Sequence, residues 1–165
     1  MSDKIAIIGG GPTGIGVARE LIEDGFAVDL YEAEADLGGV WNAEAPCGRA
    51  YASLHLISPK FNTQAPDFPM PEDYPPYPNH RLMLRYIRDF ARASGLYERT
   101  RFEAPVSRLE PVGDQWRLVT AAGHDALYPL VIVCNGLQRV PHLPEPAYPG
   151  SFAGEVLHSM EYKSG

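Results

Sequence analysis

The chain has 165 residues, 45% of them hydrophobic, which is enough for one domain with a sizeable core but short for two. Its formal net charge of −7 argues against a nucleic-acid or anionic-membrane surface. No segment reaches the roughly twenty apolar residues of a membrane span. The two cysteines, Cys47 and Cys134, are far apart, which disfavours a metal site and a dithiol redox centre. Because the N-terminus leads into an apolar stretch without a signal-peptide pattern, we expect a cytoplasmic protein.

The first forty residues predict a strand, a turn, a helix and a second strand. An apolar strand over 4–8 runs into the sequence Gly9-Gly10-Gly11-Pro12-Thr13-Gly14. A helix is expected from about Pro12 to Asp24, followed by a strand over 27–31 that ends on Glu32. The unit therefore has the order that is typical of a dinucleotide-binding β-α-β motif.

The glycines of this turn are spaced G-x-G-x-x-G, and each has a physical role in such a motif. Gly9 permits the tight turn, Gly11 lets the backbone approach a pyrophosphate, and Gly14 lets the helix pack closely on the strand. The helix N-terminus presents free N–H groups to the phosphates, and Glu32 can accept hydrogen bonds from ribose hydroxyls. The residues predict a dinucleotide site, with an ordinary glycine turn as the alternative, and leave NAD and FAD open.

The next stretch is irregular. The paired glycines of Gly38-Gly39-Val40-Trp41 indicate either a backbone that closely approaches something bulky or a turn with a half-buried tryptophan. Residues 42–79 are dense in proline and aromatic residues, which excludes a helix or a central strand and predicts a long ordered loop packed on the body. Within this loop, residues 51–58 are apolar enough for either a short helix or a strand.

The second half predicts one helix, a small meander and a buried strand. The helix runs from His80 to Ala93 or Ser94, with Asn79 as N-cap and Gly95 after its end. The short strands are expected at 99–102, 105–111, 115–120 and 124–128, with a hairpin turn at 112–114. The continuous apolar run 130–134 predicts a parallel strand buried on both faces. Gly136 follows it, where doubly wound sheets bind ligands.

In this order the segments resemble the N-terminal part of the flavin-containing monooxygenase family, over essentially the whole chain. The glycine turn with Glu32 resembles the family's FAD fingerprint, and Gly38-Gly39-Val40-Trp41 resembles its G-G-x-W segment. Residues 67–72 resemble its D-F-P-x-P-E loop, and residues 133–136 resemble the strand end that meets the flavin. Most specific is Phe152-x-Gly154-x-x-x-His158-x-x-x-Tyr162, which matches the family's F-x-G-x-x-x-H-x-x-x-(F/Y) signature.

The resemblance implies an α/β, Rossmann-like FAD-binding fold with a parallel central sheet and a small inserted antiparallel meander. It implies a single FAD-binding domain over 1–165, with 150–165 as a linker toward an NADPH domain that this chain lacks. No catalytic side chain or metal ligand is expected, since the cofactor performs the difficult step, and His158 belongs to a structural linker. The implied cofactor-binding residues are Gly9, Gly10, Gly11, Pro12, Thr13, Gly14, Glu32, Gly39, Val40, Trp41, Val106 and Gly136.

The activity implied is that of a flavin-dependent monooxygenase, which uses NADPH and O2 to oxygenate a soft nitrogen or sulfur nucleophile. The chain departs from the family at Leu56-Ile57, where several members carry an asparagine near the flavin. It has no second G-x-G-x-x-G for NADPH, so we expect little activity from the chain alone. A non-catalytic flavin-binding or dinucleotide-binding module, or an NAD-type dehydrogenase domain, remain alternatives. The expected partners are FAD and, in the complete enzyme, a small-molecule substrate. Apolar edges could also promote self-association of the chain.

Overall fold

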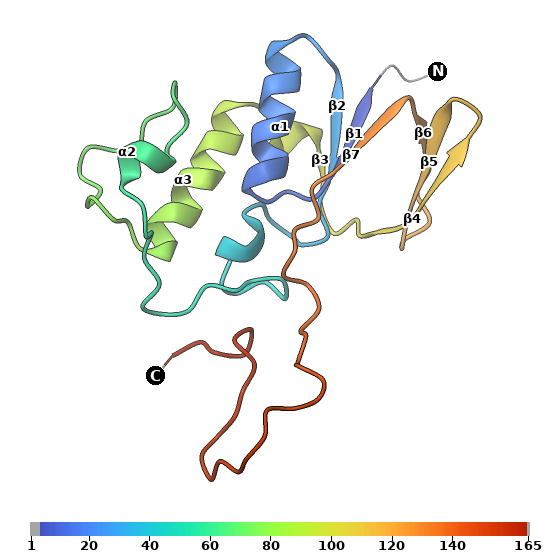
Figure 1. Cartoon of the computed structure of the whole chain (residues 1–165). Helices are drawn as coiled ribbons and strands as arrows, with labels where there is room; N and C mark the ends of the chain where they lie inside the picture. Colours follow the sequence, from blue (N-terminus) through green and yellow to red (C-terminus); the bar gives the residue numbers. More distant parts are fainter. Residues whose placement is uncertain (1–3, 165) are drawn as a thin grey trace.

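In a computed structural model of the chain, which describes residues 4–164, two β-sheets and two long helices form the body (Figure 1). The central sheet is parallel, with the strand order β3-β2-β1-β7. Its strands are β1 (Ile5–Ile8), β2 (Val28–Tyr31), β3 (Thr100–Arg101) and β7 (Leu130–Val133). The second sheet is an antiparallel meander of β4 (Val106–Val112), β5 (Gln115–Thr120) and β6 (Asp125–Tyr128). The helices are α1 (Pro12–Glu23), α2 (Lys60–Thr63) and α3 (His80–Ala93).

The central sheet is covered on both faces, and its residues alternate between two cores. Ile7 and Leu30 pack in the core with residues of α1 and α3, whereas Ala6 and Tyr31 pack in a second core with the meander. Figure 1 shows the two helices on one side of the sheet and the meander on the other. Because successive side chains of a strand point to opposite faces, one strand can serve both cores. The α/β class and the parallel sheet with an inserted meander are therefore confirmed.

The two long helices lie within a residue of their predicted bounds because local signals define their ends. Pro12 is the first residue of α1, where a missing N–H costs nothing. At the start of α3, Asn79 Oδ1 accepts hydrogen bonds from the N–H groups of Arg81 (3.1 Å) and Leu82 (3.0 Å). Gly95 follows α3 with a φ of +63°, a conformation that favours glycine after a helix. These signals lie within a few residues of each end.

Strand β7 differs from its prediction. It pairs in parallel with β1, as expected, but it is an edge strand and is not buried on both faces. Leu130 is 47% exposed and Val133 is 55% exposed. Continuous apolarity predicts burial only when another strand and a covering layer lie beside it, and among residues 4–164 no strand pairs with the outer edge of β7.

The predicted loop 42–79 contains one turn of helix, so excluding helix there was wrong for four residues. Helix α2 begins directly after Pro59, which serves as its N-cap, and ends before Pro66. Proline opposes helix in the interior but is compatible with positions that flank it. The spacing of the prolines leaves room for this single turn.

The rest of the loop has no regular structure, yet it packs on the body. Residues 51–58 form neither the helix nor the strand that their sequence left open, and make one isolated bridge, between His55 and Asn79. Met70 and Tyr74, further along, are buried in the core that contains α1 and α3. Burial of these two side chains helps to attach the irregular segment to the helices.

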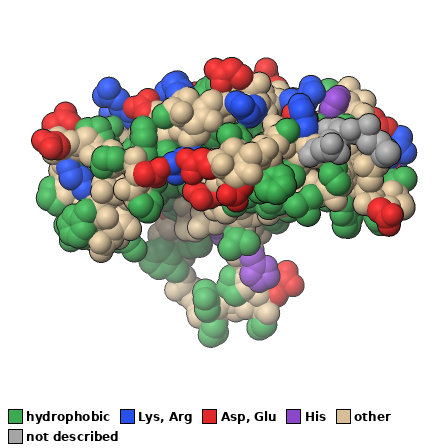
Figure 2. Space-filling model, turned by 90° about the horizontal axis from the view of Figure 1, so that it is seen from above, with side chains coloured by type: hydrophobic (Ala, Val, Ile, Leu, Met, Phe, Trp, Pro, Cys, Tyr) green, Lys and Arg blue, Asp and Glu red, His purple; other side chains and the backbone are tan. Residues whose placement is uncertain are grey.

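Charged side chains of both signs are interspersed on the surface. Figure 2 shows this mixture over the face seen from above. Many of these charges pair locally, such as Arg92 with Asp89 on α3 and Arg117 with Asp125 across β5 and β6. None of the helices described between residues 4 and 164 is both long enough and apolar enough to cross a membrane.

Residues 137–164, the C-terminal arm, extend away from the body without helix or strand (Figure 1). Both ends of the arm are held by the segment 49–52. Arg49 Nε donates to the carbonyl of Gln138 (3.0 Å), and the N–H of Ala52 donates to the carbonyl of Lys163 (2.8 Å). Between these contacts most side chains are exposed, including Phe152 of the F-x-G signature. The arm is thus a long loop anchored on the body at its two ends.

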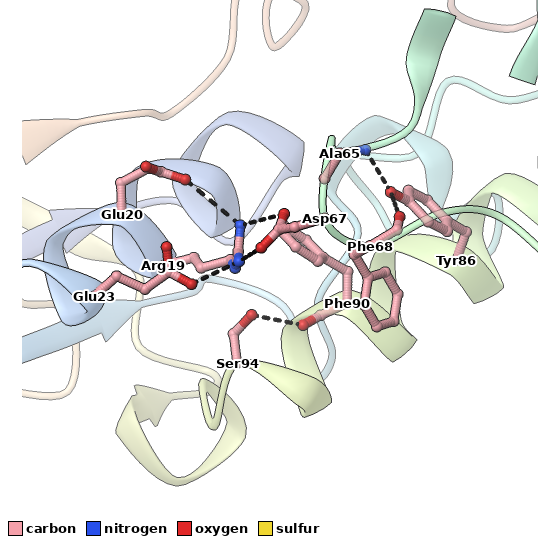
Figure 3. A network of polar contacts seen from close by, with 9 residues as sticks. All are labelled: Arg19, Glu20, Glu23, Ala65, Asp67, Phe68, Tyr86, Phe90 and Ser94. Atoms are coloured by element: carbon pink, nitrogen blue, oxygen red, sulfur yellow. Dashed lines mark hydrogen bonds and ion pairs between the residues drawn. The ribbon is translucent and has the colours of Figure 1, made fainter. Parts of the chain in front are cut away.

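A polar network joins the loop 42–79 to both long helices (Figure 3). Arg19 of α1 pairs with Glu23 one turn later (2.6 Å) and with the carboxylate of Asp67 in the loop. The Arg19 guanidinium also lies 5.2 Å from the centre of the Phe90 ring on α3. Figure 3 shows these groups converging from three segments of the chain, so one arginine connects α1, the loop and α3.

The Arg19–Asp67 pair predicts a pH dependence of stability. Hydrogen bonds from the Arg19 guanidinium hold the pKa of the Asp67 carboxyl below its usual range. A carboxyl with a lowered pKa stabilises the fold above its ordinary pKa, and that contribution is lost as the pH falls through the lowered value. We expect wild type to unfold at a higher temperature than Asp67→Asn above about pH 5, and the difference to shrink below about pH 4.

Thermal unfolding of both proteins from pH 7 to pH 3 measures this difference. Asp73→Asn is the matched control, because Asp73 is exposed and makes no ion pair with the residues described. Its difference from wild type should be small at every pH. A constant difference for Asp67→Asn down to pH 3 would show that the ion pair contributes nothing.

Candidate functional site

The glycine-rich turn connects β1 to α1 at close quarters. Gly9 has a φ of +107°, and a Cβ there would lie 2.4 Å from the carbonyl oxygen of Cys134. A Cβ on Gly14 would lie 1.9 Å from the carbonyl oxygen of Gly9, so the helix can approach the strand only without a side chain. Both positions therefore require glycine for the turn itself, independent of any ligand.

The N-terminus of α1 is open, in contrast to that of α3. Its N-cap, Gly11, has no side chain to cap the helix, and the first turn contains no acidic residue. Asn79 fills that role in α3. The first N–H groups of a helix have no partner within the helix and carry a partial positive charge. A Cβ on Gly11 would meet only the Cα of Gly39, at 3.7 Å, so a ligand atom has room beside the backbone at this position.

The segment Gly38–Trp41 closely approaches the glycine turn. The N–H of Gly38 donates to the carbonyl of Gly10 (3.0 Å), and a Cβ on Gly39 would lie 2.9 Å from the Cα of Gly11. The paired glycines thus let one loop backbone lie directly on another. Trp41, the last residue of the 3-10 helix Gly39–Trp41, is half-buried against the core with α1 and α3 and does not line the cavity described below.

Glu32 at the end of β2 is buried and holds the glycine turn in place. It is 5% exposed, and its two carboxylate oxygens accept hydrogen bonds from the N–H groups of Gly10 (2.6 Å) and Glu34 (2.9 Å). Each oxygen keeps a further lone pair, and the residue faces the cavity described next. The acid predicted to meet a ribose is therefore also a structural part of the turn.

Replacing Glu32 by glutamine should destabilise the fold by about 1–3 kcal/mol, because the amide offers one acceptor where the carboxylate offers two. One of the two N–H groups, of Gly10 or Glu34, would then face a second donor in a buried position. Urea denaturation measures the change. Glu44→Gln, at an exposed position without an ion pair among the described residues, is the control and should have no effect. Equal stability of the two variants would contradict this role.

A cavity of about 610 Å³ opens in front of the glycine turn. This volume is in the range of small-molecule sites. Its walls come from the turn, the end of β2, the start of β4 and the end of β7, and every predicted cofactor-binding residue lines it except Gly14 and Trp41. Sequence reasoning missed further lining residues that no motif marks: Tyr31, Cys47, Ala104, Pro105, Ser107, Arg108, Leu109, Gln138 and Arg139.

An irregularity in β4 lies at one of these missed walls. Four consecutive residues, 106–109, line the cavity, although alternate residues of a regular strand point to opposite faces. The pairing of β4 with β5 shifts register between Val106 and Arg108. Such a bulge redirects side chains locally, and bulges are common beside binding sites. A sequence pattern based on strict alternation cannot show it.

The cavity can bind and orient a ligand but offers no activated nucleophile. Burial and the nearby Glu34 carboxylate raise the pKa of the Cys47 thiol to about 11, so it is neutral at pH 7 and donates weakly to the carbonyl of Gly39. Burial also raises the pKa of Cys134. None of the described residues that line the cavity is a histidine. Among residues 4–164, no three His, Cys, Asp or Glu side chains are grouped to hold a metal ion.

These features define a Rossmann-type dinucleotide-binding fold. The first strand of a parallel sheet ends in a glycine turn, the next helix has an open N-terminus, and the second strand ends in an acid. The chain belongs to the flavin-binding monooxygenase-like family, whose model matches residues 2–165. Flavin-containing monooxygenase 3 of Rattus norvegicus is 32% identical over 177 aligned residues, which cover 99% of this chain and 33% of the relative. The chain thus spans about a third of the length of such curated relatives.

Solved structures agree with this assignment. A flavin-containing monooxygenase from Stenotrophomonas maltophilia superimposes with a TM-score of 0.82 at 32% identity, over 98% of this chain and 46% of that protein. An S-allyl-L-cysteine S-oxygenase from Allium sativum superimposes with a TM-score of 0.84 at 25% identity, over 97% of this chain and 42% of the other. The fold is therefore that of the N-terminal part of the family.

Proposed function

We propose that the chain is the FAD-binding part of a flavin-dependent monooxygenase that uses NADPH and O2 to oxygenate soft nitrogen or sulfur nucleophiles. The observation that carries the proposal is the open N-terminus of α1 at the cavity in front of Gly11. A dinucleotide pyrophosphate is doubly negative, and uncapped N–H groups at a helix N-terminus are a ready anion site. The glycine backbone at Gly11 leaves room for the phosphates to approach.

The residues present fit FAD, which would supply the redox chemistry that these side chains lack. The N–H groups at the start of α1 would hold the pyrophosphate, and Glu32 would accept hydrogen bonds from the ribose. The stretch from Val106 on β4 would flank the base, while Val40 and Gly136 would face the other part of the cofactor. The role of this chain is to bind and orient the cofactor and to exclude water around it.

The names of the relatives support the class of substrate. Dimethylaniline monooxygenase (N-oxide-forming) 2 of Pan troglodytes, 32% identical over 99% of this chain, is named for a nitrogen nucleophile. The S-oxygenase from Allium sativum is named for a sulfur nucleophile. The 165 residues contain one glycine-rich turn of this kind, so we infer a single FAD-binding domain, with 150–165 leading toward the nicotinamide site of a complete enzyme. We therefore expect the isolated chain to oxidise little NADPH.

Reconstitution with FAD tests the proposal. Protein incubated with FAD and desalted should show absorbance bands near ~375 and ~450 nm, as expected for an oxidised flavoprotein. NAD+ and NADP+, titrated in parallel, should bind more weakly than FAD if the site is a flavin site. A folded protein that takes up no FAD would overturn the proposal, and tighter binding of NAD+ would favour a dehydrogenase domain.

A second candidate is a flavin-binding module without catalysis. The absence of an acid–base pair or activated thiol from the cavity lining is compatible with it. The two candidates differ in the reduced protein. Because little activity is expected from the chain alone, the decisive result is a positive one. If FAD bound to this chain is reduced chemically and reoxidised by O2, formation of a sulfoxide or N-oxide from an added thioether or tertiary amine would contradict a module without catalysis.

A further inference from the structure

A chain of hydrogen-bonded side chains joins the meander to the central sheet. The hydroxyls of Tyr31 on β2 and Tyr128 on β6 lie 2.6 Å apart, and Tyr128 Oη donates to Asp29 Oδ2 (2.9 Å). Tyr31 Oη also lies 3.1 Å from Nε2 of His124, in the turn between β5 and β6. Tyr31 and Tyr128 are almost completely buried, at 1% and 2% exposed. Lys4 Nζ donates to the other oxygen of Asp29 (2.8 Å) and forms an ion pair with it.

The chemistry of Asp29 determines the direction of every hydrogen bond in this chain. An ionised carboxylate only accepts, so the single proton of Tyr128 is directed at Asp29. Tyr128 can then only accept from Tyr31, whose own proton is used in that contact. Toward His124, Tyr31 Oη can then only accept, so Nε2 of His124 must carry the hydrogen of that contact. Burial raises the pKa of both phenols, so both hydroxyls keep their protons near neutral pH.

The same side chains pack behind one wall of the cavity. Tyr31 and Tyr128 belong to the core between sheet and meander, and Val106 and Leu109 of β4 pack against that core. Val106, Leu109 and Tyr31 itself also line the cavity. In Figure 1 the meander lies beside the central sheet, away from the helices. The position of the β4 wall relative to the glycine turn therefore depends on how the meander is attached to β2.

We propose that Tyr128 is a positioning residue of the dinucleotide site, and that a one-directional relay from His124 through Tyr31 and Tyr128 to Asp29 holds the β4 wall against the sheet. The relay requires a hydrogen on Nε2 of His124. The neutral Nε2–H tautomer and the imidazolium both meet this requirement, whereas the Nδ1–H tautomer does not. The hydroxyl of Tyr128 acts through the wall and does not itself touch the ligand.

The tautomer of His124 is tested on the wild-type chain without any ligand. Long-range ¹H–¹⁵N NMR correlations at about pH 8, where an ordinary histidine is neutral, distinguish the two ring nitrogens. We expect Nε2 to be protonated and Nδ1 to be free of hydrogen. The Nδ1–H tautomer, or rapid averaging between both tautomers, would overturn the relay. This measurement does not depend on FAD, so failure of the relay and failure of the proposed function are distinguishable.

The positioning role rests on the proposed FAD site and is tested by affinity. Tyr128→Phe keeps the ring and removes the hydroxyl, and it should raise the dissociation constant for FAD about tenfold. Tyr86→Phe is the matched control. Tyr86 Oη donates to the carbonyl of Phe68 (2.7 Å) and accepts from Ala65 N–H (2.7 Å), in the other core and outside the cavity. It should lower the unfolding temperature and leave FAD affinity unchanged.

Rescue by a conservative replacement separates positioning from general stability. His124→Ala removes the donor and should weaken FAD binding about fivefold, whereas His124→Gln restores an N–H donor and should bind FAD nearly as wild type does. Affinity measured well below the unfolding temperature excludes unfolding as the cause. If Tyr128→Phe lowers only the unfolding temperature, as Tyr86→Phe does, or if His124→Gln binds no better than His124→Ala, the positioning role is refuted.

Discussion

Gly11→Val should abolish FAD binding, raising the dissociation constant at least about a hundredfold, while the chain still folds. Gly11 has a φ of −78° and a ψ of 178°, an extended conformation that a β-branched residue adopts readily. A Cβ there would make one ordinary contact, with the Cα of Gly39 at 3.7 Å. The branched side chain would instead occupy the space in front of the α1 N-terminus, where the pyrophosphate is proposed to lie.

Fluorescence titration with FAD measures the affinity, and circular dichroism confirms the fold. The matched control is Gly16→Ala, in the interior of the same helix, where a Cβ would meet nothing within 4 Å. This control should stabilise the chain by about 0.5–1 kcal/mol, because alanine favours helix over glycine, and should bind FAD as wild type does. Wild-type affinity of Gly11→Val would show that the glycine turn does not hold the pyrophosphate.

Gly14→Ala should instead destabilise the fold, by about 3 kcal/mol or more. A Cβ at this position would lie 1.9 Å from the carbonyl oxygen of Gly9 and 3.1 Å from its carbonyl carbon. Both are backbone atoms of the glycine turn, and Gly9 already packs closely against the backbone of Cys134. The carbonyl of Gly9 therefore cannot move away easily from the new side chain. Helix α1 would have to shift off β1, which opens the main core. The loss is a large part of the 5–15 kcal/mol that a typical domain has.

Urea denaturation compares Gly14→Ala with wild type, again with Gly16→Ala as control. The two substitutions lie two residues apart on one helix and change helix propensity by the same amount. The difference in unfolding free energy between the two variants therefore measures the clash of the Gly14→Ala Cβ with the carbonyl of Gly9. FAD binding should fall together with the folded fraction in Gly14→Ala, in contrast to Gly11→Val, which loses binding alone. If Gly14→Ala were as stable as Gly16→Ala, the close contact of α1 with the turn would be wrong.

The sequence predicted correctly those parts of the fold whose conformation is determined by residues close to them in the chain. The glycine spacing, Pro12 at the start of α1, and Asn79 and Gly95 at the ends of α3 act within a few residues. Their bounds and their order follow from propensity and sterics alone. The cavity-lining residues that were predicted, such as Gly10, Gly11 and Val40, belong to such motifs or to the family segments that accompany them.

Other features were decided when distant segments came together. Trp41 packs against residues of α1 and α3 that are far from it in the sequence, and the burial of Glu32 depends on which N–H groups reach it. The exposure of β7 depends on the strands beside it, which its own apolar residues cannot specify. Nothing near Tyr128 in the sequence marks the hydroxyl as a partner of Tyr31, because the two are brought together by the packing of the meander on the sheet.

The sequence by itself determined that the chain begins with a dinucleotide-binding β-α-β unit. The turn of this unit has no room for a side chain at Gly9 or Gly14, so the glycines at these two positions identify it. The tertiary structure alone decided the shape of the site around that unit. The cavity wall at 106–109 lies where the pairing of β4 with β5 shifts register, which no pattern in the sequence marks. Its position depends on buried hydrogen bonds between strands that are far apart in sequence, and such contacts are made only when both faces of the central sheet are covered.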